Sequence, residues 1–212
     1  MMKELRKNLT DKQKDELARA RAVAVTQYEA ALETFGTEVT TEDSGSRASV
    51  QKRLGDIYMS MTLDTDLAAD EQKNRERGAD HYWRAAQEHH LAGEHGDRAQ
   101  MLRVVAEFNS GRIGELEGDD LTRAVERVTT LYQDAGESYG KAARPLKQAT
   151  MLYRLGEFYK RLPEDYPRKD ELAVGYYKGA RQILSAEKRY AEEARVATTI
   201  AEQIPARIRA ET

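Results

Sequence analysis

The stretch that decides the fold class runs from residue 119 to residue 140 and reads DDLTRAVERVTTLYQDAGESYG. Two acidic residues open it and Gly140 closes it, and these residues suit the beginning and the end of a helix. Its apolar residues recur at intervals of three and four, which is the period of a helix with one buried face. These residues are Leu121, Ala124, Val125, Val128, Leu131, Tyr132 and Ala135.

The same period predicts helices over most of the chain. Four prolines and the lack of sustained apolar-polar alternation leave little room for strands. Thr10 and Gln13 have the spacing of a capping box, so the first helix should begin near residue 11. We predict an all-α protein of about eight helices in one domain, 1–212: a flanking helix within 1–35, a loop at 36–46, helices at 47–63, 65–93, 97–113, 119–140, 145–162, 169–185 and 187–204, and a tail at 205–212.

Two internal patterns indicate a repeat. A small residue, an aromatic residue four places later and an alanine three places after that occur in alternate predicted helices, and the aromatic residues are 45 to 55 residues apart. The members are Ala24-Tyr28-Ala31, Ala79-Trp83-Ala86, Val128-Tyr132-Ala135 and Ala173-Tyr177-Ala180. The intervening helices at 47–63 and 145–162 share a second pattern, Leu54-Gly55-Asp56-Ile57-Tyr58 and Leu155-Gly156-Glu157-Phe158-Tyr159.

Glycine inside a helix costs about 1 kcal/mol relative to alanine. Its presence at two equivalent places, Gly55 and Gly156, therefore indicates that a neighbouring helix approaches closely there.

These patterns resemble the tetratricopeptide-repeat family, in which the first helix of each hairpin carries Leu-Gly-x-x-Tyr and the second carries Ala, an aromatic residue and Ala. The resemblance covers about 47–204 and implies three stacked antiparallel hairpins followed by a capping helix. The family period is 34 residues, whereas the units here span about 45–55, and the helix at 97–113 lacks the Leu-Gly signature.

The resemblance also implies a function. Members of the family bind a peptide or a partner helix in a groove lined by the first helices, through residues that flank the glycine. The corresponding residues here are Lys52, Asp56, Met59, Tyr153, Glu157 and Lys160. The family's carboxylate-binding clamp has Lys and then Asn at two of these places, so Lys52 followed by Asp56, and Tyr153 followed by Glu157, do not support it.

Composition excludes several classes of function. The chain of 212 residues has no cysteine, so it contains no disulfide, no thiolate nucleophile and no cysteine metal site. Its 34 Lys and Arg against 37 Asp and Glu give no strong basic or acidic balance. It shows no secretion signal and no apolar run of the roughly 20 residues that cross a bilayer. We expect a soluble, cytoplasmic protein without membrane contact.

Two alternatives to a protein-interaction module stay open. The four histidines lie between positions 81 and 95, and His90 and Glu94 have the spacing of two ligands on one helical face, so a metal-binding helical bundle is one alternative. A nucleic-acid- or ribosome-associated protein is the other, because basic residues gather at Arg98, Arg103, Lys141, Arg144, Lys147, Arg207 and Arg209. Intervening acids and the lack of neighbouring aromatic residues weaken it.

The sequence contains no phosphate-binding glycine loop and no nucleophile elbow. We therefore expect no enzyme activity, no cofactor and no resident metal. The favoured interpretation is a non-catalytic adaptor or scaffold that binds a protein or peptide partner.

Overall fold

The computed structural model describes residues 10–35, 40–61 and 68–203. In these ranges the chain forms eight α-helices and one short 3-10 helix, with no strand, so the all-α prediction is confirmed. Contacts within the chain divide it into two compact units, Met1–Glu94 (unit 1) and His95–Thr212 (unit 2). Among the residues described, no helix combines the length and the apolar character needed to cross a membrane.

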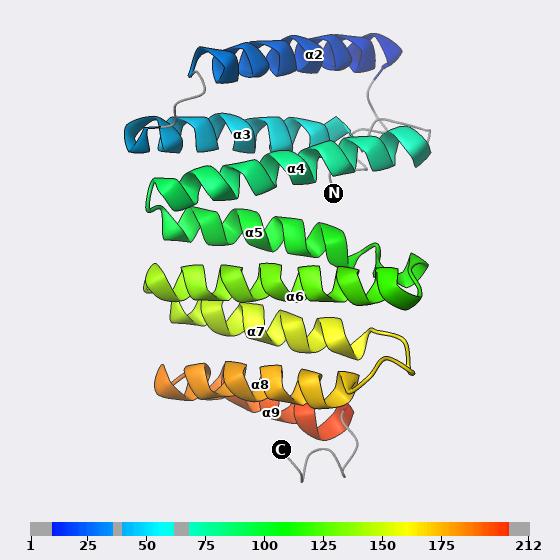
Figure 1. The fold of residues 1–212 in the computed structure, drawn as a ribbon, viewed down its shortest axis with the longest axis vertical. Coiled ribbons are helices and arrows are strands. Elements are labelled where there is room, and N and C mark those ends of the chain that lie inside the picture. Colours follow the sequence, from blue (N-terminus) through cyan, green and yellow to red (C-terminus); the bar gives the residue numbers. More distant parts are fainter. Residues whose placement is uncertain (1–9, 36–39, 62–67, 204–212) are drawn as a thin grey trace. The chain divides into compact units, whose positions relative to one another are not determined.

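Unit 1 contains α2 (Asp11–Thr34), α3 (Thr41–Met61) and α4 (Ala68–Leu91). The capping box predicted at Thr10 is present, because the backbone N–H of Gln13 bonds the Thr10 hydroxyl and the Gln13 side chain accepts from the Thr10 N–H. Helices α3 and α4 form an antiparallel hairpin (Figure 1). Helix α2 contacts α3, but none of its residues is fully buried.

The predicted loop at 36–46 is wrong for its second half, since α3 begins at Thr41. Thr40 explains the early start. Its hydroxyl accepts the backbone N–H of Asp43 at 3.2 Å and donates to the Asp43 carboxylate at 2.6 Å, which caps the first turn. Ser44 is consequently helical and buried and does not lie in a loop.

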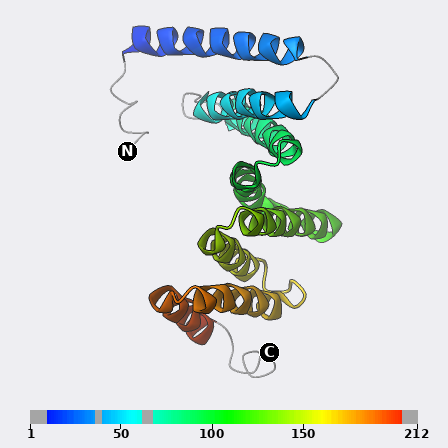
Figure 2. The same ribbon diagram turned by 90° about the vertical axis from the view of Figure 1, so that its left-hand side faces the viewer.

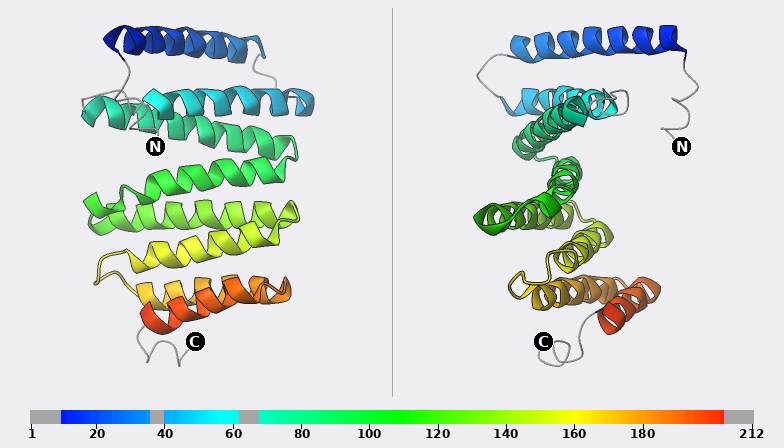
Figure 3. Two further views of the ribbon diagram at one scale, coloured as in Figure 1. Left: turned by 180° about the vertical axis from the view of Figure 1, so that it is seen from behind. Right: turned by 90° about the vertical axis from the view of Figure 1, so that its right-hand side faces the viewer.

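Unit 2 contains α5 (His95–Ser110), a 3-10 turn (Ile113–Glu115), α6 (Gly118–Lys141), α7 (Pro145–Lys160), α8 (Lys169–Ala186) and α9 (Tyr190–Gln203). Each helix of this unit packs on the next one along the chain (Figures 2 and 3). The hairpins α5/α6 and α7/α8 occur as predicted, and α9 covers α8. Pro145 stands in the first turn of α7, where its missing N–H would have had no partner within the helix.

The two Leu-Gly segments make the same contact in their hairpins. In α3/α4 the ring of Tyr82 lies on Gly55, and its hydroxyl donates to Asp56 at 2.7 Å. In α7/α8 the ring of Tyr177 lies on Gly156, and its hydroxyl donates to Glu157 at 2.5 Å. A tyrosine of the second helix thus fills the place of the missing Cβ and binds the carboxylate that follows. We call this contact the Tyr-Gly-acid lock.

The lock corrects the register of the repeat in α4. The sequence pattern paired Trp83 with Tyr132 and Tyr177, but Trp83 is 38% exposed while Tyr82 is buried. The equivalent row in α4 is therefore Gly78, Tyr82 and Ala85. The sequence pattern fits Tyr82 as well as Trp83 because the two aromatic residues are adjacent, and only the contact of Tyr82 with Gly55 distinguishes them. Tyr190, the first residue of α9, is exposed as well.

The turns that follow the second helices also repeat. Gly93, Ala143 and Lys188 have left-handed backbone conformations, with φ of 71°, 53° and 56°. In each turn the next residue's N–H bonds a carbonyl five residues earlier, as in a Schellman motif. These turns follow α4, α6 and α8, and their spacing of 50 and 45 residues agrees with the period of the sequence pattern.

Replacing Gly156 by alanine should destabilise unit 2. The new Cβ would lie 2.4 Å from Tyr177 Cε1, and Tyr177 is fully buried and held by Glu157, so the ring cannot move aside freely. Overpacking of this kind costs about 1–3 kcal/mol, which outweighs the gain of about 1 kcal/mol in helix propensity. Urea unfolding followed by circular dichroism measures the difference.

Gly175→Ala is the matched control, because Gly175 lies within α8 and a Cβ there meets nothing within 4 Å. It should raise the free energy of unfolding by up to about 1 kcal/mol. A Gly156→Ala protein as stable as Gly175→Ala would contradict the lock.

His81 should make unit 1 less stable as the pH falls. Its ring stacks on Tyr58 at 5.4 Å, its Nδ1 lies 2.7 Å from Gln51 Oε1, and burial together with Arg84 lowers the pKa of His81 below its ordinary 6.5. The unfolded chain therefore takes up the proton first, and stability is lost as the pH falls from 6.5 through the folded pKa. Urea melts at pH 7 and pH 5 should show a smaller loss for His81→Gln than for the parent, and an NMR titration of His81 above 6.5 would contradict the expectation.

Candidate partner-binding surface

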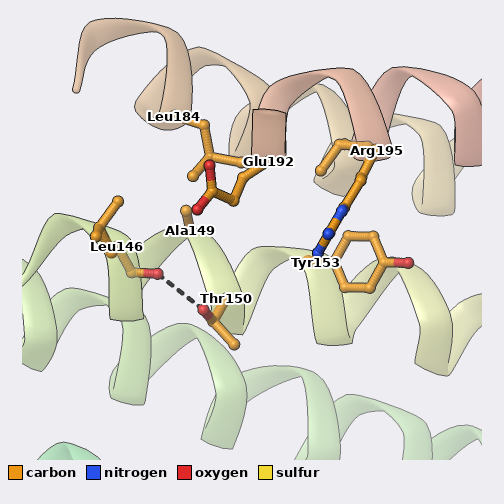
Figure 4. A pocket seen from close by; sticks show the side chains of 8 residues that line it. Leu146, Ala149, Thr150, Tyr153, Leu184, Glu192 and Arg195 are labelled. Carbon is orange, nitrogen blue, oxygen red and sulfur yellow. Dashed lines mark hydrogen bonds between the residues drawn. The ribbon is translucent and has the colours of Figure 1, made fainter. Parts of the chain in front are cut away.

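Helix α7 presents side chains to two hollows on the surface of unit 2. The first, which we call the apolar pocket, has a volume of about 440 Å³ and lies between α7 and α9 (Figure 4). Helix α7 supplies residues at intervals of three and one, which places them on one face. The lining residues are Leu146, Ala149, Thr150 and Tyr153 of α7, Leu184 of α8, and Glu192, Arg195 and Val196 of α9.

The walls of this pocket are mainly hydrocarbon. Ala149, Leu184 and Val196 are buried and form its floor, while Leu146 is 40% exposed at the rim. In Figure 4 the Arg195 side chain extends from α9 toward the α7 side of the pocket, where Tyr153 lies. An apolar side chain from another molecule would bury hydrocarbon here and meet polar groups at the edge.

Tyr153 contacts both of the other helices that line the pocket. Its ring packs against Tyr177 with ring centroids 5.3 Å apart, and its hydroxyl lies 3.4 Å from the Thr199 hydroxyl of α9. Tyr153 thus connects α7 with both α8 and α9. The neighbouring Tyr177 is the tyrosine of the lock on Gly156, so the shape of the pocket depends on the packing inside the hairpin.

The second hollow, which we call the basic pocket, has a volume of about 330 Å³ and lies between α5 and α7. Three of the described residues that line it are cations, and none carries a carboxylate. They are Gln100 and Arg103 of α5, Tyr139 of α6, and Lys147, Thr150, Met151 and Arg154 of α7. Thr150 lines both pockets, so the two hollows meet on α7.

Ion pairs orient the cations of the basic pocket. Glu107 accepts a hydrogen bond from Arg103 at 2.7 Å and a second one from Arg154, which ties α5 to α7. The Lys147 ammonium lies 5.4 Å from the centre of the Tyr139 ring. One carboxylate thus stands among three cations, and the pocket keeps a positive charge.

The six residues expected to bind a partner fall into both units. In unit 1, Lys52 pairs with Asp56 at 2.8 Å, Asp56 accepts the lock hydrogen bond from Tyr82, and Met59 packs on Gly78. All three therefore have contacts within their own hairpin. Partner binding at these positions stays a prediction.

In unit 2 the structure distinguishes the three remaining positions. Glu157 accepts the lock hydrogen bond from Tyr177, and Lys160 pairs with Asp170 of α8 at 3.2 Å. Tyr153 lines the apolar pocket. Replacing Glu157 or Lys160 would change the stability of the hairpin as well as the surface, so neither is a clean probe of binding.

Sequence reasoning missed most of the residues that line the two pockets. Arg103 and Lys147 appeared in separate basic patches, and folding brings them to one hollow with Arg154. Leu146 lies outside the buried stripe of α7, so the helical pattern does not select it as a core residue. A large apolar residue on the otherwise exposed face of a helix is the signal that could have identified it as part of a binding surface. Arg207 and Arg209 lie outside the described residues.

The histidine cluster is arranged differently from the candidate metal pair. Glu94 bonds Nδ1 of His89 at 2.6 Å, and His90 is exposed. Within the described ranges, no three or more His, Asp and Glu side chains form a group suited to a metal ion. The contact between His89 and Glu94 instead joins the end of α4 to the turn that follows it.

No family model, no curated protein and no solved structure matches this chain. The resemblance to tetratricopeptide repeats therefore stays a hypothesis.

Proposed function

We propose that this chain is a non-catalytic protein-interaction module that holds a segment of a partner protein on the α7 surface of unit 2. The apolar pocket between α7 and α9 carries the proposal. It is open to the surface, its floor is hydrocarbon, and it lies beside a second hollow of different chemistry. Binding segments of proteins commonly combine an apolar anchor with surrounding polar contacts.

The size of the pocket supports a side-chain anchor. Its volume of about 440 Å³ falls within the range of about 300–1,000 Å³ that is typical of ligand sites. Leucine or an aromatic side chain would remove the exposed part of Leu146 from water. Each such anchor contributes roughly 1.5–3 kcal/mol by burial.

Selection from a library of displayed random 12-residue peptides tests the proposal on the full chain. Enriched peptides should contain a leucine or an aromatic residue, and alanine at that position should abolish binding. Labelled synthetic copies then give a Kd by fluorescence anisotropy. Leu146→Glu should weaken binding at least about tenfold, which corresponds to about 1.4 kcal/mol.

Leu146→Glu suits the experiment because an acidic residue in the first turn of α7 is favourable for the helix. The control is Val23→Glu, which adds the same charge at an apolar residue that is 57% exposed on α2. It should change the Kd less than twofold. If no peptide is enriched, or if Leu146→Glu binds every enriched peptide as the parent does, the proposed function is wrong.

A further inference from the structure

The basic pocket beside the apolar pocket holds more positive charge than the ion pairs within it neutralise. Arg103 and Arg154 each donate to Glu107, and this single carboxylate offsets at most one of the three positive charges, including Lys147. A guanidinium has five N–H donors; Arg103 engages one nitrogen with Glu107, and Arg154 is hydrogen-bonded to both Glu107 and Tyr132. Donors thus remain for a further carboxylate.

Resting on the proposed function, we infer that the partner segment is acidic: it places an Asp or Glu side chain in the basic pocket while its apolar anchor fills the apolar pocket. Charge complementarity carries this inference. A carboxylate here would form charge-assisted hydrogen bonds with Arg103 or Arg154 and an ion pair with Lys147. The Arg103 and Arg154 side chains are only 28% and 42% exposed, so these interactions are partly shielded from water.

The floor of the pocket strengthens the attraction. Met151 and Tyr139 beneath the cations are 2% and 3% exposed. Packed side chains rather than water therefore lie on one side of the charges, and this lowers the local dielectric constant. A bound carboxylate would interact more strongly here than with the same cations on an open surface.

The shared residue Thr150 places the two pockets side by side on α7. The α7 residues that line the apolar pocket and those that line the basic pocket occupy neighbouring faces of the helix, with Thr150 at the boundary. The acidic residue of the partner should therefore lie close to the apolar anchor in the bound segment.

The chemistry favours an acidic protein segment over a nucleic acid. Proteins that bind single strands stack bases on exposed aromatic rings along a basic track. Tyr139 is the aromatic residue among the described residues that line the basic pocket, and it is buried beneath Lys147. The adjoining pocket offers hydrocarbon, which suits an apolar side chain rather than a phosphate backbone.

Peptide selection with the full chain, repeated on Lys147→Glu, tests the inference. The parent should enrich peptides that carry Asp or Glu close to the apolar anchor, and amide replacement of that residue should weaken binding. Lys147→Glu should weaken these peptides about tenfold at 50 mM salt and less at 500 mM, because salt screens exposed charges. Peptides in which Lys replaces the acidic residue should regain affinity for Lys147→Glu.

The folding of the variant and a matched charge change elsewhere serve as controls. Lys147 stands in the first turn of α7, where glutamate is favourable, so the variant should fold, and a circular-dichroism melt verifies it. The control is Arg123→Glu, the same charge change at a residue of α6 that is 75% exposed and pairs with Asp120. It should leave peptide binding within twofold of the parent.

Each result has a distinct meaning. Enriched peptides that depend on Leu146 but contain no acidic residue would overturn the inference and leave the proposed function standing. Absence of any enriched peptide would overturn both. Tight binding of a labelled 20-nucleotide oligothymidine, lost in Lys147→Glu, would show that the pocket serves a nucleic acid and would also overturn the inference.

Discussion

The Tyr-Gly-acid lock is the contact on which the rest of each Leu-Gly hairpin depends. A glycine in the first helix lets the ring of a tyrosine from the second helix approach its backbone, and the tyrosine hydroxyl then binds the next carboxylate. Burial raises the pKa of both Tyr82 and Tyr177, and the hydrogen bonds to Asp56 and Glu157 raise it further. These tyrosines therefore stay protonated donors, and the lock fixes both the spacing and the register of the helices.

The middle hairpin shows how the same position can be filled differently. Ala106 and Glu107 stand 51 residues after Gly55 and Asp56 and 50 before Gly156 and Glu157. Ala106 is buried, and Glu107 accepts from Arg103 and Arg154. Asp56 and Glu157 each accept a hydrogen bond from a tyrosine of their own hairpin, whereas the equivalent Glu107 connects α5 with α7 through Arg154. This change positions the cations of the basic pocket.

The lock also explains why some of the six residues predicted from the family resemblance are engaged within their hairpin while Tyr153 lines a pocket on the surface. Residues that flank the glycine were expected to face a groove, but the acid directly after the glycine faces the tyrosine of the second helix. Tyr153, three residues before Gly156, packs against that ring and lines the apolar pocket. The part of α7 that can contact a partner is therefore its N-terminal half, where Leu146, Lys147 and Thr150 lie, and not the residues next to Gly156.

The sequence by itself determined the helical class, the hairpin order and the close approach at both glycines, because helix period, capping residues and the cost of a mid-helix glycine are local properties. It did not distinguish Tyr82 from Trp83, since adjacent aromatic residues fit the same pattern until one meets Gly55. Nor did it bring Arg103, Lys147 and Arg154 to one pocket or Leu146 and Val196 to another. Tertiary structure decided these, because the charge and shape of a surface depend on which helix lies beside which.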